Sequence, residues 1–371
     1  MNFDFSDEQK ELQRSARRML EKQCPMQRVR AVLEGKDNFD RATWSTLAEM
    51  GLCGAAIPPA WGGLGAGYLE LCVIAEELGR ALAPVPFDST VCLFAEIIGL
   101  AGSDQQKSLY LPRVAQGTLI GTVAWAESRA VASDAIHSTV TGGILSGMKC
   151  PVMDGGCADL AVVVAHEAQD TAPTLFLVEL GSPGVRRHPV ETLDPSRKHV
   201  LLNFQGVQAE RLGPRGGGLE ILSRAFDRAA VLVAFQQIGG AERALEMARS
   251  YAQQRAAFGR PIGSFQAIKH MLADMLVSLT LARSNACYAA WALESGSADL
   301  PVAAATARVS ATAAFQHCST NNIQVHGGIG FTWEFDAHLF YRRSNLLALS
   351  LGPQSQWEAK LIDRLRARNV A

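Results

Sequence analysis

The spacing of hydrophobic and polar positions divides the chain into three stretches with different periods. Residues 1–117 carry apolar positions at helical spacing, residues 118–216 alternate between apolar and polar, and residues 217–371 return to the helical period in longer runs. The pattern predicts a mainly α protein with a central β domain. In chain order we expect a helical N-terminal domain, a small middle β domain and a C-terminal four-helix bundle.

Start and stop signals place the helices of the first stretch. Ser6, followed by the acids Asp7 and Glu8, is typical of a helix N-terminus, and apolar spacing continues through Ala16 and Leu20. Further helices are expected at residues 40–49, 69–83, 88–100 and 104–115. In the middle stretch, β-branched runs between Gly- and Pro-containing turns predict six to eight strands. The clearest strands are residues 122–125, 139–141, 161–164, 174–178 and 199–202.

Four long helices are expected in the last stretch, at residues 226–254, 267–294, 301–324 and 356–368. Residues 255–266 form the corner between the first two. Phe258-Gly259, with Pro261 close behind, is predicted to stop the first helix, because glycine accepts a left-handed exit and proline cannot continue a helix. Ser264 is the predicted cap of the next helix.

Composition excludes several classes of function. The net charge is -1 over 371 residues, which argues against general nucleic-acid binding. No apolar run reaches the roughly 18 residues of a membrane span, and Met1–Asp7 has acids where a signal peptide needs bases. The eight cysteines form no C-x-x-C pair, so we expect reduced thiols in a cytoplasmic protein and no metal site.

Two separated motifs carry a family resemblance. Residues 238–266 end in R-A-A-F-G-R-P-I-G-S-F-Q, and residues 324–334 read Q-V-H-G-G-I-G-F-T-W-E. With the shorter matches at residues 3–8, 61–65 and 75–80, the chain resembles the acyl-CoA dehydrogenase family over nearly its whole length. In finer detail it is similar to partner subunits that act on bulky or dicarboxylic acyl-CoA thioesters, such as pimeloyl-CoA or steroid side chains.

The resemblance implies a β-barrel for the middle domain and a tetramer built as a dimer of dimers. It also implies chemistry: a carboxylate removes the α-proton of an acyl-CoA, the β-hydride goes to FAD, and an electron-transferring flavoprotein takes the electrons. In the family, the ADP part of FAD is held across the dimer interface. The residues that match those contacts are Arg255, Phe258, Gln266, Gln324, Gly327 and Gly328. Ser133 matches a position that contacts a CoA phosphate.

The chain departs from the family where the proton acceptor belongs. The usual glutamate position is Leu351, the alternative one is Ala229, and neither side chain can accept a proton. Contacts to the flavin ring are altered as well. Ala126 stands where the family has a threonine before its glutamate, and residues 151–154 are expected to form a turn that has lost a tryptophan and a threonine.

Three readings follow from the difference between the matched FAD contacts and the missing proton acceptor. In the first, the chain is a partner subunit that lacks a base and completes the FAD site of another chain. In the second, it is an active homotetramer whose base has moved to Asp227 or Glu127. In the third, it is a non-enzymatic member that keeps the bundle for binding. His326, inside the second motif, is either close to the cofactor or only a residue of a capped loop.

Overall fold

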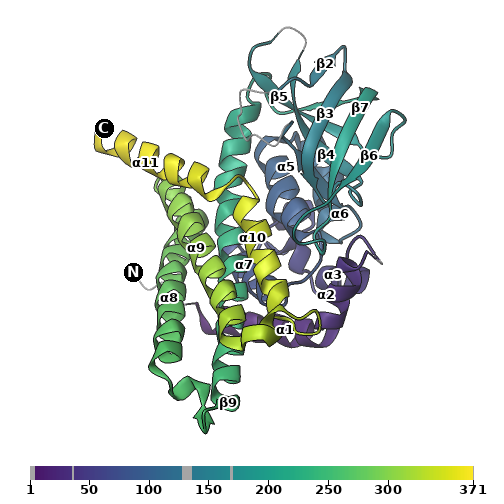
Figure 1. Ribbon diagram of the computed structural model, residues 1–371. Coiled ribbons are helices and arrows are strands. Elements are labelled where there is room, and N and C mark those ends of the chain that lie inside the picture. Colours follow the sequence, from purple (N-terminus) through teal and green to yellow (C-terminus); the bar gives the residue numbers. More distant parts are fainter. Residues whose placement is uncertain (1–4, 36, 128–135, 168–169, 371) are drawn as a thin grey trace. The chain divides into compact units, whose positions relative to one another are not determined.

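The computed structural model describes residues 5–35, 37–127, 136–167 and 170–370 (Figure 1). The chain forms two compact units. The first contains residues 1–27, 68–83 and 230–371, and the second contains residues 28–67 and 84–229. Helix α7 (Gly218–Gln254) contributes residues to both.

The first unit is helical. Its described elements include α1 (Asp7–Gln23), α4 (Tyr68–Arg80), the larger part of α7, α8 (Gln266–Glu294), α9 (Leu300–His326), α10 (Ala337–Leu349) and α11 (Gln354–Val370). The C-terminal stretch thus has five helices among its described residues where the sequence predicted four. The additional helix is α10, whose buried face includes His338, Arg343 and Ser344 and so lacks a plain apolar stripe.

The predicted start of α1 is confirmed. The Ser6 hydroxyl accepts a hydrogen bond from the backbone amide of Gln9, and the side-chain oxygen of Gln9 accepts one from the backbone amide of Ser6. This capping box satisfies two of the amides that a helix start leaves without partners. Ala16 and Leu20 are buried, as their spacing predicted.

Glycine allows α4 and α7 to approach backbone to backbone. A Cβ atom added at Gly239 would lie 1.9 Å from the Glu76 carbonyl oxygen, and one added at Gly79 would lie 2.0 Å from that of Gln236. Neither distance leaves room for a side chain. The crossing therefore brings the charged residues of α4 against those of α7.

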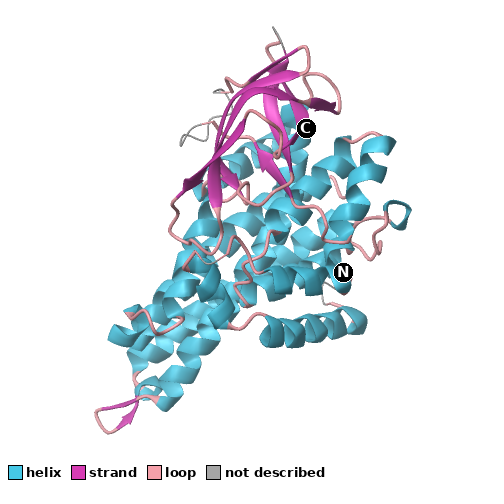
Figure 2. Cartoon of the chain, turned by 90° about the vertical axis from the view of Figure 1, so that its right-hand side faces the viewer, coloured by secondary structure: helices cyan, strands magenta, loops and turns pink. Residues whose placement is uncertain are grey.

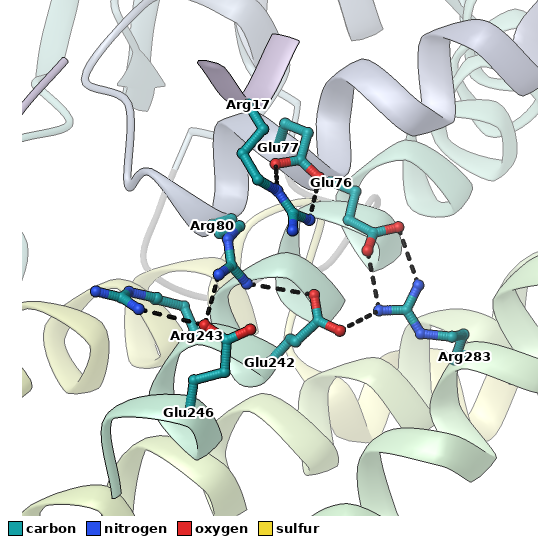
Figure 3. A network of polar contacts seen from close by, with 8 residues as sticks. All are labelled: Arg17, Glu76, Glu77, Arg80, Glu242, Arg243, Glu246 and Arg283. Carbon is teal, nitrogen blue, oxygen red and sulfur yellow. Dashed lines mark hydrogen bonds and ion pairs between the residues drawn. The ribbon is translucent and has the colours of Figure 1, made fainter. Parts of the chain in front are cut away.

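A network of alternating charges joins four helices of this unit (Figure 3). Arg17 of α1 holds Glu77 of α4 with two bonds of 2.8 and 2.7 Å. Arg80 of α4 bonds Glu246 of α7 at 2.5 Å. The further members of the network are Glu76, Glu242, Arg243 and Arg283. The 3.5 Å contact of Arg283 on α8 with Glu242 on α7 fits the predicted antiparallel return of α8.

The second unit contains short helices, a sheet and the first part of α7. Its short helices are α2 (Met26–Leu33), α3 (Arg41–Glu49), the π-helix η3 (Asp88–Ala95), α5 (Glu96–Ala101) and α6 (Asp104–Ala115), with short 3₁₀ turns at η1 (Leu52–Gly54) and η2 (Pro59–Trp61). The helix predicted at residues 104–115 is confirmed with its bounds, and the helix predicted at residues 40–49 is α3, which Asp40 caps. The helix α2 was not predicted.

Among the described residues, eight strands form one sheet in the order β6-β7-β3-β2-β4-β5-β8, and β1 pairs with β4. Figure 2 shows the strands of this sheet in magenta. The strands are β1 (Gly121–Ala124), β2 (Thr139–Thr141), β3 (Ile144–Met153), β4 (Leu160–Glu167), β5 (Pro173–Glu179), β6 (Val185–Val190), β7 (His199–Gln208) and β8 (Glu210–Leu212). The predicted number of strands is confirmed. Among the described pairings none joins β6 to β8, and the barrel that the resemblance implied stays a prediction.

One turn prediction is wrong. Pro151, Val152 and Met153 belong to the end of β3, and Val152 and Met153 pair with β7. The chain turns at Asp154, which has a φ of 55°. Within the described ranges, no helix is both long enough and apolar enough to span a membrane, and no cluster of His, Cys, Asp or Glu there could hold a metal ion.

Candidate functional site

The predicted corner after α7 is a small β-hairpin. Helix α7 ends at Gln254, and β9 (Ala256–Ala257) then pairs with β10 (Arg260–Pro261). Phe258 and Gly259 connect them with φ angles of 53° and 79°. Two successive positive φ angles are typical of a type I′ hairpin turn. Phe258-Gly259 is therefore the tip of a hairpin, and the helix stop predicted there lies before Arg255.

The predicted cap of α8 is wrong. Ser264 belongs to the 3₁₀ turn η4 (Ile262–Ser264), and the N-cap of α8 is Phe265, which makes no side-chain capping bond. Within the part of the chain that the structure describes, the buried Ser264 hydroxyl has no hydrogen-bond partner. The sequence rule favoured serine, but the 3₁₀ turn moves the start of the helix past it.

Phe258 has two unusual properties. Its side chain is 94% exposed, and its backbone occupies the left-handed region that bulky residues avoid. Its ring lies edge-on to Phe265 at 6.2 Å between centroids, and the Arg260 guanidinium lies 4.1 Å above the Phe265 ring. An exposed aromatic side chain on a strained turn points to a surface that contacts another molecule.

The second predicted cofactor segment is the end of α9. Gln324 is exposed, α9 ends at His326, and the 3₁₀ turn η5 (Gly327–Phe331) follows. Gly327 has a φ of 62°, which requires glycine or strains any other residue. A Cβ added at Gly327 or Gly328 would meet nothing within 4 Å. The backbone of both glycines is thus open to a ligand that approaches from outside.

The two segments meet through His326. Its ring lies 4.2 Å from that of Tyr251, which is in the last turn of α7 before the hairpin. On its other side, Phe335 lies 4.5 Å away. The structure therefore brings the hairpin with Arg255 and the turn with Gly327 and Gly328 to the same end of the helices. Sequence reasoning named His326 but missed the two flanking rings, which have no spacing that marks them.

Both predicted base positions are hydrocarbon and buried. Leu351 is 5% exposed and has a φ of 60°, and Ala229 is fully buried. The backbone around Leu351 is held firmly. Trp357 donates its indole N–H to the Leu351 carbonyl at 3.1 Å, and buried Arg308 donates to the carbonyls of Leu347 and Ser350. The segment is rigidly built, but it presents no proton acceptor.

Glu127 is already bonded by other groups. Its carboxylate accepts bonds from the Lys149 ammonium at 2.6 Å and from the amides of His137 and Ser138 at 2.5 and 2.9 Å. Burial acts to raise the pKa of Glu127, but these bonds outweigh it and hold the pKa below its ordinary value. A carboxylate stabilised in this way is a poor base. Asp227, the other candidate, is a buried residue of α7.

The flavin-ring positions have no hydrogen-bond donors in their side chains. Ala126 is buried, and the Met153 sulfur lies 3.4 Å from an Arg197 guanidinium nitrogen. Neither alanine nor methionine can donate to a flavin nitrogen or oxygen. Ser133, the predicted CoA contact, lies outside the described residues.

Two domain families match the sequence. Residues 6–118 match the acyl-CoA dehydrogenase N-terminal domain, and residues 216–358 match the acyl-CoA dehydrogenase C-terminal domain. The chain belongs to the acyl-CoA dehydrogenase family, whose members are FAD-dependent oxidoreductases.

The chain is also similar to individual proteins and solved structures of this family. The chain is 35% identical to the acyl-CoA dehydrogenase IpdE2 of Mycobacterium tuberculosis, over 85% of this chain and 84% of that protein. It is similar in structure to the Tcur3481-Tcur3483 steroid ACAD, with a TM-score of 0.88 and 33% identity over 98% of this chain and 99% of the other. The ChsE4-ChsE5 complex of Mycobacterium tuberculosis gives a TM-score of 0.90 and 26% identity over 99% of both chains. These matches extend over the β-sheet region between the two domain families.

The residues present suit one part of FAD better than another. An exposed arginine, two exposed amides and two open glycines are suited to phosphates and hydroxyls. The positions expected to serve the flavin ring have no donor in their side chains, and Leu351 and Ala229, expected to serve the substrate α-carbon, have no proton acceptor. The same chain therefore fits the ADP part of a cofactor and does not fit the reacting centre.

Proposed function

We propose that this chain is a subunit of an FAD-dependent acyl-CoA dehydrogenase that lacks its own base and completes the FAD site of a partner chain. One observation carries the proposal. The residues predicted to contact the cofactor are exposed at one end of the helices, whereas Leu351 and Ala229, the positions predicted for the base, are buried hydrocarbon. The complex would desaturate an acyl-CoA thioester between its α- and β-carbons.

Each exposed residue has a role that follows from its chemistry. The Arg255 guanidinium presents a fork of donors that matches two oxygens of a pyrophosphate. Gln266 and Gln324 supply amides that hydrogen-bond to hydroxyls, and Phe258 covers an apolar face of the cofactor. Gly327 and Gly328 let the backbone amides come close. When bound, FAD accepts the hydride from the β-carbon, and the partner chain supplies the carboxylate that takes the α-proton.

The relatives support a hetero-oligomer and a bulky substrate. Two of the similar structures carry names that pair two chains, and one is described as a steroid dehydrogenase. We therefore propose a tetramer of two chain types that acts on a large acyl-CoA such as a steroid side-chain thioester. An electron-transferring flavoprotein would take the electrons, Ser133 would contact a CoA phosphate, and the cytoplasm would be the compartment.

Replacing Arg255 tests the proposal. The chain is co-expressed with an acyl-CoA dehydrogenase chain from the same genome that has a glutamate at the usual position, and the FAD content of the purified complex is measured. Arg255→Ala removes the phosphate fork, so we expect FAD affinity to fall by roughly 10- to 100-fold, as for loss of a charged hydrogen bond.

Arg249→Ala is the matched control. Arg249 is exposed on α7, the helix that leads to Arg255, and its removal takes away the same charge without touching the hairpin. Full FAD content in the Arg255→Ala complex would contradict the proposal. Equal losses in both variants would point to net charge and not to a contact.

A further inference from the structure

We propose that His326 is the positioning residue that holds the two cofactor-contacting segments in register, so that the hairpin and the glycine turn reach one FAD together. This inference rests on the proposed function, because it concerns how the same surface is kept in shape. His326 itself is 5% exposed, and its ring is enclosed by protein on both faces, so it acts through its neighbours.

The first link runs to the hairpin. The His326 ring lies 4.2 Å from the Tyr251 ring, with 33° between their planes. The Tyr251 carbonyl accepts the amide of Arg255 at 2.8 Å, and the Arg255 carbonyl accepts the amide of Ile262 at 2.8 Å. The residue against which His326 packs is therefore bonded directly to the backbone of the predicted phosphate-binding arginine.

The second link runs to the glycine turn. His326 is the last residue of α9 and precedes Gly327 in the chain. A Cβ added at Gly330 would lie 3.1 Å from the His326 Cβ, so the turn folds closely over this residue. Phe335 covers the other face of the ring at 4.5 Å. A change in the ring would thus move the turn as well as the hairpin.

The orientation of the ring is fixed by one hydrogen bond. His326 Nδ1 lies 2.7 Å from the carbonyl oxygen of Asn322, one turn earlier in α9. Because a carbonyl only accepts, Nδ1 carries the proton, and a neutral ring then has its lone pair on Nε2. The ring cannot rotate without breaking this bond and both ring contacts.

The environment of His326 favours the neutral form. Burial lowers the pKa of His326 below its ordinary value of 6.5, and the bond to Asn322 acts in the opposite direction. Of the three contacts described for the ring, Tyr251 of α7 is titratable, whereas Phe335 and Asn322 are not. Since the folded pKa is lowered, the arrangement is fully stable above about pH 6.5 and weakens as the pH falls through the folded pKa.

Three variants in the FAD-loaded complex test the inference, with FAD affinity measured by fluorescence titration at several pH values. His326→Leu removes the ring and the donor, and we expect the dissociation constant for FAD to rise by about tenfold. His326→Phe keeps a ring between Tyr251 and Phe335, so it should bind FAD within about threefold of the natural chain at neutral pH. Its FAD affinity should also stay constant below about pH 6.5, where the affinity of the natural chain weakens.

The third variant, Phe315→Leu, separates positioning from stability. Phe315 is buried on α9, and a Cβ added at Gly240 would lie 2.4 Å from its ring. It lies far along α9 from the two cofactor-contacting segments. Its loss should lower the unfolding temperature and leave FAD affinity unchanged. If Phe315→Leu weakens FAD binding as much as His326→Leu does, His326 has no positioning role.

Arg255→Ala distinguishes this inference from the proposal beneath it. Loss of FAD in Arg255→Ala together with tight binding in His326→Leu would overturn the positioning role alone. Retention of FAD in Arg255→Ala would overturn the proposed function and this inference with it. Persistent pH dependence in His326→Phe would also count against the role assigned to the histidine ring.

Discussion

At the scale of single residues, the proposed function separates cofactor binding, assigned to exposed residues, from proton transfer, for which Leu351 and Ala229 offer no acceptor. The residues predicted to contact FAD were identified through the family resemblance, and that role stays a prediction, although the structure shows that Arg255, Gln324 and the two glycines are exposed. Contacts between distant side chains could not be predicted from the sequence. Lys149 is 22 residues from Glu127, and its apolar neighbours in the sequence gave no sign that it turns inward on β3. Only the fold brings the two charges together.

The Glu127–Lys149 pair makes a prediction about stability. Lys149 is fully buried, and burial lowers its pKa while the bond to Glu127 acts in the opposite direction. Glu127→Ala leaves the ammonium without its carboxylate, so we expect the free energy of unfolding to fall by about 3–5 kcal/mol. The double variant Glu127→Leu with Lys149→Met should cost less than the single one. Urea denaturation of each chain measures these differences.

A further variant, Glu127→Gln, tests the second reading, in which the catalytic base has moved to Asp227 or Glu127. If Glu127 were the catalytic base, Glu127→Gln would abolish turnover in a complex that remains folded and retains FAD. We expect turnover that follows the remaining folded protein instead. A folded, FAD-loaded Glu127→Gln complex without activity would revive that reading.

At the scale of elements, the success of sequence reasoning depended on local signals. The start of α1 was predicted because Ser6 and the acids after it are a local signal, and the structure shows that α3 and α6 have similar local caps at Asp40 and Ser103. The elements that were missed carry polar residues on their buried faces or apolar residues too few to form a stripe. On β3 the buried positions include Lys149, and β6 contains charged residues and a proline. Tertiary packing determines whether such segments form helices or strands, and the local sequence pattern does not show that packing.

The charge network of α1, α4, α7 and α8 gives the first unit a dependence on pH. Burial acts to raise the pKa of Glu246, yet the bonds from Arg80 and Arg243 outweigh it and hold that pKa below its ordinary value of 4.5. Because the folded pKa is lowered, the stabilisation is present above about pH 4.5 and is lost as the pH falls through the folded pKa.

Glu246→Gln should therefore reduce the acid sensitivity of the fold. We expect the unfolding temperature of the variant to fall less than that of the natural chain between about pH 6 and pH 4. Asp274→Asn changes an exposed carboxylate on α8 and is the control. An identical pH dependence in Glu246→Gln and the natural chain would mean that the network does not set the acid limit.

At the scale of the whole molecule, the fold was predictable because two long-range motifs and the order of helix, sheet and helix agree. Figure 1 shows that order along the chain from the N-terminus to the C-terminus. The division into domains at residues 117 and 217 stays a prediction, since the compact units do not follow the chain order. A single sequence does not identify a partner, because under the proposed function the side chains that complete the site would belong to another chain.

Isolation of the chain provides the last prediction. If its cofactor residues serve a neighbour and its own ring contacts are lost, the purified chain should be colourless and should reduce no dye with an acyl-CoA. Co-expression with a chain that carries the missing glutamate should give a yellow complex with dye-reducing activity. A yellow, active protein from this chain alone would favour the homotetramer with a relocated base. A chain that stays colourless with every such partner would favour a non-enzymatic binding role, because an exposed arginine and an exposed aromatic residue can also serve a purely structural interface.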